Sequence, residues 1–294
     1  MRSVEPEGCI VVDKPPGWTS HDVVARARRL LATRRVGHAG TLDPDATGVL
    51  VLGVGRATRL LRFATLLHKT YVAEVVLGVA TSTLDASGEV VARVDMSGVA
   101  LEDVRQAAVS LTGRIAQVPP MVSAVKVGGR RLHDLAREGR QVERAPRPVE
   151  VRRFEVFPTG EEAVVRVLVE CSSGTYVRVL AADLGARLEG AAHLRSLRRL
   201  AVGSFTDAEA VPLDEVSPES LRPPLELVRD LARAGAYGAL LDGLRHGRAL
   251  ERRALGVSGE GPWAVVGPEG ELVAVCTPRG TDRVQPVVVL DVAR

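Results

Sequence analysis

The sequence predicts an α+β protein with a small β-rich domain at its end. Through the first 228 residues, strand-like runs rich in Val and Leu are interspersed with amphipathic helical stretches. The last part, residues 229–294, is dominated by a hairpin pattern at 263–276 and a strand pattern at 285–292. Hydrophobic residues make up 46% and aromatic residues only 3%, so the core must be built from Val, Leu and Ala. A length of 294 residues suits one large domain followed by one small domain.

The first half of the chain opens with a short buried strand at 9–12, which ends in a Pro-Pro-Gly turn. Thr19 and Asp22 have the spacing of a capping box, which predicts a helix at 20–31. The further expected elements are a strand at 49–54, an amphipathic helix at 56–67, a strand at 71–79, a turn at 84–89, an extended segment at 90–94 and a helix at 101–111.

The second half contains an excursion from the core at about 117–143, which ends in a basic helix at 130–140. A solvated charged face is the alternative interpretation of that helix. Strands are expected at 149–157 and 164–171, followed by a helix at 176–188, a basic segment at 193–201 that leads into another strand, and a proline-rich border region at 212–224.

Amino-acid composition limits the cellular compartment and the kinds of binding site that the protein can contain. The formal charge is +3, and only three of the 39 basic residues are lysines, Lys14, Lys69 and Lys126. Arginine suits phosphate contacts, although a GC-rich genome would produce the same excess. Three cysteines without a CxxC pair argue against disulfides and structural zinc. With neither a signal-peptide core nor an apolar run of transmembrane length, we expect a cytoplasmic protein that does not enter a membrane.

Several familiar sites are missing from the sequence. It has no G-x-x-x-x-G-K-[ST] phosphate loop, no complete dinucleotide fingerprint, no H-E-x-x-H metal motif and no G-x-S-x-G elbow. The six histidines are scattered without metal-ligand spacing. We therefore expect no metal and no cofactor.

The densest chemical feature is the loop GHAGTLDPDATG at residues 37–48. Its glycines allow tight turns and close approach to another molecule, and Pro44 fixes the turn directly after Asp43. A carboxylate on a rigid loop beside a buried strand can serve as a nucleophile or general base. The alternative is an Asp that only caps its own turn.

Five ordered blocks give the sequence a specific resemblance. They are VVDKPPGWTSHDVV, GHAGTLDPDATGVLVLGVGRATR, KTYVAEVVLG, PPMVSAVKVGGRRLHDLAREG, and CSSGTYVRVLAADLG with HLRSLRRLAVGSF. Together they resemble the tRNA pseudouridine-55 synthases of the bacterial TruB type, over roughly residues 8–207. The probability that five blocks agree in this order by chance is very small, whereas a glycine loop alone would be weak evidence.

The resemblance implies the pseudouridine synthase fold, a mostly antiparallel mixed sheet with flanking helices and an RNA-clamping insertion. It also implies a PUA-like, RNA-binding C-terminal domain at 229–294. The family isomerises uridine-55 in the tRNA T-loop, without cofactor or metal. Its nucleophile matches Asp43, not Asp45. Attack on C6, attack on C1′ and assisted glycal formation all remain open. We expect a monomer that binds the tRNA T-arm.

Further roles follow from the same resemblance. Arg178 would pair with Asp43 and keep it ionised, and Tyr71 would stack on the flipped base. His38 would fill the space that the base leaves. Each has a structural alternative, such as a core tyrosine for Tyr71. The other implied substrate contacts are Tyr176 and Leu200 along the uracil pocket, Asp85 near the base, and Lys126 with the arginines of 130–140 on the T-arm.

Three alternative functions are also compatible with the sequence, and each would use the same surfaces. A tRNA-folding chaperone would bind without chemistry. A relative inside a guide-RNA complex would usually have basic tails and a longer C-terminal domain. A hydrolase that activates water through Asp43 would release free uracil.

Overall fold

The computed structural model describes residues 5–123, 125–140 and 142–290. The chain divides into two compact units. Unit 1 comprises Met1–Pro44, Gly48–Leu66 and Val202–Arg294, and unit 2 comprises Asp45–Thr47 and Leu67–Ala201. In the described part of the chain, no helix has the length and apolar character needed to cross a membrane.

The N-terminal part of unit 1 is built on β1 (Gly8–Lys14), which pairs antiparallel with β3 (Thr47–Val54) and parallel with β14 (Val211–Pro212). The short strand β2 (Val36–His38) pairs antiparallel with the C-terminal end of β3. Helix α1 (Ser20–Leu30) packs its apolar face on these strands. The predicted capping box of Thr19 and Asp22 is confirmed.

The predicted helix at 56–67 has two parts. A 3₁₀ helix over Gly55–Leu60 precedes the α-helix α2 (Leu61–Leu66). Gly55 has φ +64°, and a Cβ there would lie 2.6 Å from the carbonyl oxygen of Pro6. The chain therefore enters this helix through a turn that favours glycine, which the helical periodicity of the following residues does not reveal.

The segment 212–224, which we predicted to be a border region, packs into the N-terminal core. Leu213 and Val216 are buried in the same core cluster as β1, β3 and α1. Backbone hydrogen bonds of 2.9 Å connect Cys9 and Arg222 in both directions. The prolines shape short 3₁₀ turns that close the N-terminal core, so this segment is part of that core.

The C-terminal sheet of unit 1 has the strand order β15-β17-β18-β19-β16. Its strands are β15 (Ala232–Gly235), β16 (Leu250–Glu251), β17 (Trp263–Val266), β18 (Leu272–Arg279) and β19 (Arg283–Val289). The predicted hairpin at 263–276 corresponds to β17 and β18. Helix α6 (Gly238–Arg245), which we did not predict, packs Leu244 against Trp263 and its neighbours. The domain boundary at 228/229 stays a prediction.

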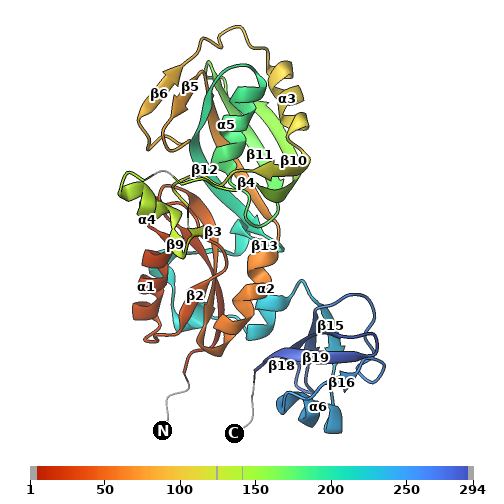
Figure 1. Ribbon diagram of the computed structural model, residues 1–294. Helices are drawn as coiled ribbons and strands as arrows, with labels where there is room; N and C mark the ends of the chain where they lie inside the picture. Colours follow the sequence, from red (N-terminus) through yellow and green to blue (C-terminus); the bar gives the residue numbers. More distant parts are fainter. Residues whose placement is uncertain (1–4, 124, 141, 291–294) are drawn as a thin grey trace. The chain divides into compact units, whose positions relative to one another are not determined.

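Unit 2 is organised around a sheet of order β12-β4-β11-β10-β7 (Figure 1). The strands are β4 (Lys69–Leu77), β7 (Gly113–Gln117), β10 (Arg147–Pro158), β11 (Val164–Cys171) and β12 (Ala192–Val202). Helix α3 (Leu101–Ser110) packs against β10 and against α5 (Val177–Arg187). A separate hairpin joins β5 (Val79–Thr81) and β6 (Val90–Arg93).

The predicted basic segment at 193–201 is itself part of strand β12, and it leads into the short strand β13 (Phe205–Thr206), as predicted. Its arginines are divided between environments: Arg195 is exposed, whereas Arg199 is only 1% exposed. The closely spaced basic residues gave no sequence pattern typical of a strand, although β12 contains both exposed and buried residues.

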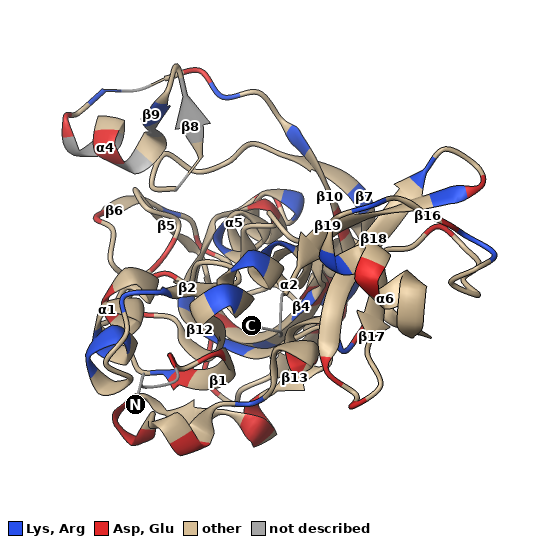
Figure 2. Ribbon diagram, turned by 90° about the horizontal axis from the view of Figure 1, so that it is seen from below, with Lys and Arg blue, Asp and Glu red and all other residues tan. Residues whose placement is uncertain are grey.

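The predicted excursion is present as residues 118–146, between the paired strands β7 and β10. It contains a hairpin of β8 (Lys126–Val127) with β9 (Arg130–Arg131), then helix α4 (Leu132–Arg137). The predicted basic helix at 130–140 is therefore too long at both ends. Arg130 forms an ion pair with Glu138, and Figure 2 shows acidic as well as basic segments in this region.

Glu209 provides a test of how unit 1 is held together. Its carboxylate is bound by Arg222, Arg229 and the backbone N–H of Thr206. Burial alone would raise the pKa of Glu209, but these hydrogen bonds outweigh it and hold the pKa at about 2. Because the folded pKa lies below the unfolded value, the stabilisation is present above about pH 4.5 and is lost as the pH falls toward 2.

We therefore expect the free energy of unfolding to fall by on the order of 2 kcal/mol between pH 6 and pH 3 through this group. Urea unfolding of the wild type and of Glu209→Gln at both pH values measures the effect. The variant should show a smaller loss, and equal losses would contradict this account.

Candidate active site

Asp43 lies in unit 1, in the loop between β2 and β3, and is partly buried. The chain passes from unit 1 to unit 2 between Pro44 and Asp45. Positive φ angles at Gly40 (+102°) and Gly48 (+99°) show where the loop needs glycine. The predicted glycine-dependent geometry is therefore present on both sides of Asp43.

The two neighbours of Asp43 are fixed by hydrogen bonds to other parts of unit 1. The Ser20 hydroxyl accepts from the backbone N–H of Leu42 at 2.9 Å and donates to its carbonyl at 3.2 Å. On the other side, the carbonyl of Pro44 accepts from the Lys14 ammonium at 2.7 Å and from the Gly17 N–H at 3.0 Å. The backbone that carries Asp43 is thus held immediately before and after it.

Lys14 is fully buried and supplies the strongest of these contacts. Its ammonium also donates to the carbonyls of Pro15 (2.9 Å) and Trp18 (2.6 Å). Three carbonyl acceptors match the three N–H bonds of an ammonium group, a geometry that the planar guanidinium of arginine does not reproduce.

His38 ends β2, opposite Leu52 of β3. Its ring lies 5.5 Å from the ring of His21 in an edge-to-face arrangement. The structure thus places His38 in unit 1 with Asp43, at the end of β2 and beside His21 in the first turn of α1.

The remaining predicted residues belong to unit 2, where Arg178 is almost completely buried. Its side chain, on α5, is 4% exposed. One terminal nitrogen lies 3.3 Å from the Asp85 carboxylate and 3.2 Å from the Thr83 carbonyl, and the other donates to the Val122 carbonyl at 2.9 Å. The guanidinium therefore connects α5, the turn at 82–88 and the insertion. Its pairing with Asp43 stays a prediction.

Asp85 is held in a fixed orientation. Its second carboxylate oxygen accepts from the Thr83 hydroxyl at 2.6 Å and from the hydroxyl and N–H of Ser87 at 2.6 and 3.1 Å. Leu84 before it has φ +65°. Asp85 is therefore held in one orientation as a hydrogen-bond acceptor beside Arg178.

Three further residues lie on the sheet and on α5. Tyr71 points inward from β4, is 8% exposed and faces Val169 of β11. Tyr176 is the N-cap residue of α5, and Leu200 lies on β12; both are partly buried. Lys126 falls in β8, but its side chain lies outside the part of the chain that is described.

The sequence analysis missed two polar residues that organise these groups, Lys14 and Gln117. Gln117 is 2% exposed and hydrogen-bonds the backbone of Tyr176. A usable signal existed for Lys14, since lysine is rare in this arginine-rich chain. No local signal marked Gln117, because its partner is 59 residues away.

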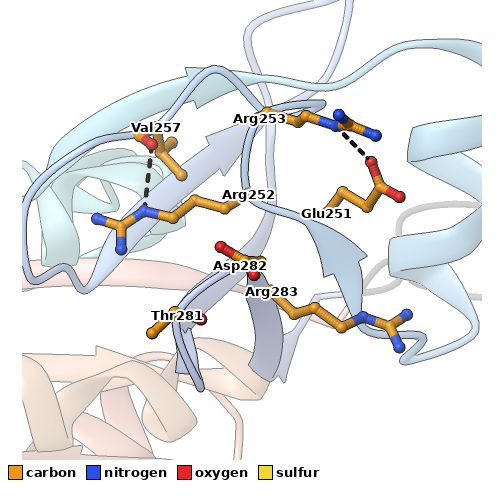
Figure 3. Close-up of a pocket in the computed structure, with 7 residues that line it drawn as sticks. All are labelled: Glu251, Arg252, Arg253, Val257, Thr281, Asp282 and Arg283. Atoms are coloured by element: carbon orange, nitrogen blue, oxygen red, sulfur yellow. Dashed lines mark hydrogen bonds and ion pairs between the residues drawn. The ribbon is translucent and has the colours of Figure 1, made fainter.

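A second candidate region lies in the C-terminal sheet of unit 1. A pocket of about 780 Å³ is lined by Arg252, Arg253 and Arg283 together with Glu251, Val257, Thr281 and Asp282. Figure 3 shows Arg252 directed to the carbonyl of Val257 and Arg253 directed to Glu251. Arg253 is 87% exposed, so its guanidinium keeps most of its surface for another molecule.

Lys69 provides a pH test of unit 2. It is 5% exposed and donates to the carbonyl of Leu67 at 2.6 Å. Burial, with a smaller effect of nearby Arg199, lowers the pKa of Lys69 to about 8. The unfolded chain therefore binds more protons than the folded protein between about pH 8 and pH 10.5, and stability contributed by this group rises with pH over that window.

We expect the stability of the wild type relative to Lys69→Met to increase by about 1 to 2 kcal/mol from pH 7.5 to pH 9.5. Urea unfolding of both proteins measures this difference. Cys171 titrates in both proteins, so its opposing effect cancels to first order. A difference independent of pH would contradict a depressed pKa.

Comparison with known proteins identifies the family. The model for the N-terminal domain of TruB family pseudouridylate synthases matches residues 28–177, and the model for the C-terminal part of tRNA pseudouridine synthase II matches 242–291. The chain is 50% identical to tRNA pseudouridine synthase B of Rhodococcus jostii, with 93% of this chain and 90% of that protein covered. It is 46% identical to the protein of that name from a Mycobacterium species (strain KMS), with 96% of each covered.

Solved structures agree. The crystal structure of a Cbf5-Nop10-Gar1 complex contains a chain with 27% identity and a TM-score of 0.73, covering 97% of this chain and 84% of that chain. The predicted α+β pseudouridine synthase fold is confirmed. Since the identities are high over almost the whole length, this chain belongs to the TruB family of pseudouridylate synthases and is an isomerase.

Proposed function

We propose that this protein converts uridine-55 in the T-loop of tRNA to pseudouridine, with Asp43 as the nucleophile. The observation that carries the proposal is the fixation of the Asp43 loop through Leu42 and Pro44. A nucleophile gains from a backbone held in place before the substrate arrives, because little ordering remains for the transition state. The relatives named tRNA pseudouridine synthase B support tRNA as the substrate.

The reaction is an isomerisation. The bond between C1′ and N1 breaks, the uracil turns within the site, and a bond forms between C1′ and C5. The hydrogen on C5 leaves as a proton, and N1 takes up a proton, so the product has the composition of the substrate. No oxidant, reductant or energy source is needed.

The other site residues divide the remaining tasks. The target base is stacked inside a folded T-loop, so it must be flipped out to be reached. Tyr71 is proposed to receive its face, Tyr176 and Leu200 to line the uracil pocket, and His38 to fill the vacated space. Arg178 is proposed to keep Asp43 ionised, while Asp85 holds the Arg178 guanidinium at 3.3 Å.

Removal of the Asp43 carboxylate tests the proposed nucleophile. We expect Asp43→Ala to form pseudouridine at least about 10³-fold more slowly, with tRNA affinity nearly unchanged, because a nucleophile acts on the chemical step. Carbodiimide labelling and primer extension on an unmodified tRNA transcript measure the product, and filter binding measures affinity.

Asp45→Ala is the matched control, since Asp45 is an exposed acid in the same loop. It should retain activity within a few-fold. Equal product from Asp43→Ala would remove Asp43 from the mechanism. Binding without product in the wild type would favour a chaperone, and release of free uracil would favour a hydrolase. The 46–50% identity to tRNA enzymes supports the free enzyme over a guide-RNA subunit.

The C-terminal sheet is proposed to contact tRNA phosphates through the arginine-lined pocket. Arg253 and Arg283 are both exposed, and Arg283 is also fixed by a 2.6 Å hydrogen bond to the carbonyl of Ala249. Guanidinium groups bind phosphate oxygens in pairs, and each phosphate contact releases counterions.

We expect the double variant Arg253→Ala, Arg283→Ala to bind tRNA more weakly. The slope of log affinity against log salt should be smaller by about 1 for each phosphate that the variant no longer binds. Filter binding between 50 and 200 mM salt, roughly the useful range, measures it. Arg233→Ala, in exposed β15 at the opposite edge of the sheet, is the control. An unchanged slope would exclude this pocket from the RNA interface.

A further inference from the structure

The side chain of Gln117 makes a paired contact with the backbone of one pocket residue. Its amide oxygen accepts from the N–H of Tyr176 at 3.0 Å, and its amide nitrogen donates to the carbonyl of Tyr176 at 3.4 Å. The side-chain amide therefore binds both the N–H and the carbonyl of Tyr176, as the backbone of a neighbouring strand would. At 2% exposure, no bulk water can replace either bond.

This contact fixes the start of α5, which lacks a cap of its own. Tyr176 is the N-cap residue, and its side chain makes no capping hydrogen bond. Its carbonyl already accepts from Val179 and Leu180 at 3.1 Å each, as the first turn requires. The N–H of Tyr176 lies outside the helical ladder, and Gln117 is the partner that satisfies it.

The same stretch of chain returns to α5 a few residues later. Gln117 ends β7, and Val122, five positions on, accepts a hydrogen bond from Arg178 at 2.9 Å. The first turn of α5 is thus held at Tyr176 by Gln117 and at Arg178 by Val122. Arg178 in turn contacts Asp85 at 3.3 Å. A shift of Tyr176 would also move the backbone of Arg178, which lies two residues further along the first turn of α5.

From this geometry we propose that Gln117 is a positioning residue for the reaction, which sets Tyr176 and the first turn of α5 so that Arg178 meets Asp85. The inference rests on the proposed function. Gln117 does not touch the substrate in this account. Its loss affects the chemical step through Tyr176 and Arg178 and leaves the arginine-lined pocket of the C-terminal sheet, which is proposed to bind tRNA, intact.

The first test replaces Gln117 with an apolar residue of similar length. Gln117→Met should lower the single-turnover rate of pseudouridine formation by about 10- to 100-fold and change the dissociation constant for tRNA by less than about 3-fold. Val151→Ala is the matched control: it opens a cavity in neighbouring β10 and removes only apolar atoms, so it destabilises unit 2 by packing alone. The control should keep the wild-type rate at a temperature where both variants are folded.

A second variant keeps the test decisive where Gln117→Met does not fold. Gln117→Glu retains the oxygen that accepts from Tyr176, and its carboxyl group can donate to the Tyr176 carbonyl only when protonated. Burial at this position raises the pKa of that carboxyl group, so the rate relative to the wild type should recover several-fold as the pH is lowered from 8 to 6.

Two results would overturn the proposal: a Gln117→Met rate within about 2-fold of the control, or a constant ratio of the Gln117→Glu and wild-type rates across this pH range. Either result, with an active wild type and an inactive Asp43→Ala, would leave the proposed function intact. An inactive wild type would refute the proposed function itself.

Discussion

The buried ammonium of Lys14 is the contact on which the Asp43 loop depends. One side chain at the end of β1 binds the carbonyls of Pro15, Trp18 and Pro44, and so joins the first strand, the turn after it and the residue that follows Asp43. A buried cation is tolerated only when its hydrogen bonds are satisfied. Any displacement of the Asp43 loop that broke the Pro44 contact would leave a buried N–H without that acceptor, and this cost holds the loop in one conformation.

The two units use polar groups in the same way. In unit 1 the hydroxyl of Ser20 binds both backbone groups of Leu42, and in unit 2 the amide of Gln117 binds both backbone groups of Tyr176. Each is a single buried side chain that replaces a strand partner where the backbone is irregular. Irregular backbone near reacting groups permits close approach to a ligand, and such paired contacts satisfy its polar groups.

The sequence was most informative where structure is decided locally. The capping box at Thr19 and Asp22 and the hairpin at 263–276 were predicted correctly, because both depend on residues close in the chain. Strand β12 was missed because its cations gave no alternation, and its extended form depends on pairing with β4. The site residues came from the resemblance, whereas Lys14 and Gln117 act across 30 and 59 residues, so no local pattern predicts their hydrogen-bond partners.

The position of the insertion has a consequence for how such enzymes can vary. Residues 118–146 leave and re-enter the sheet through neighbouring antiparallel strands, with Gln117 directly opposite Arg147. The pairing of β7 with β10 therefore continues up to the two residues that flank the insertion, and it does not depend on the length of the insertion. Doubling a loop costs only about 0.6 kcal/mol in closure entropy, so the part of this segment beyond Val122 can lengthen, shorten or be exchanged in evolution while the strands that carry the proposed site residues keep their alignment.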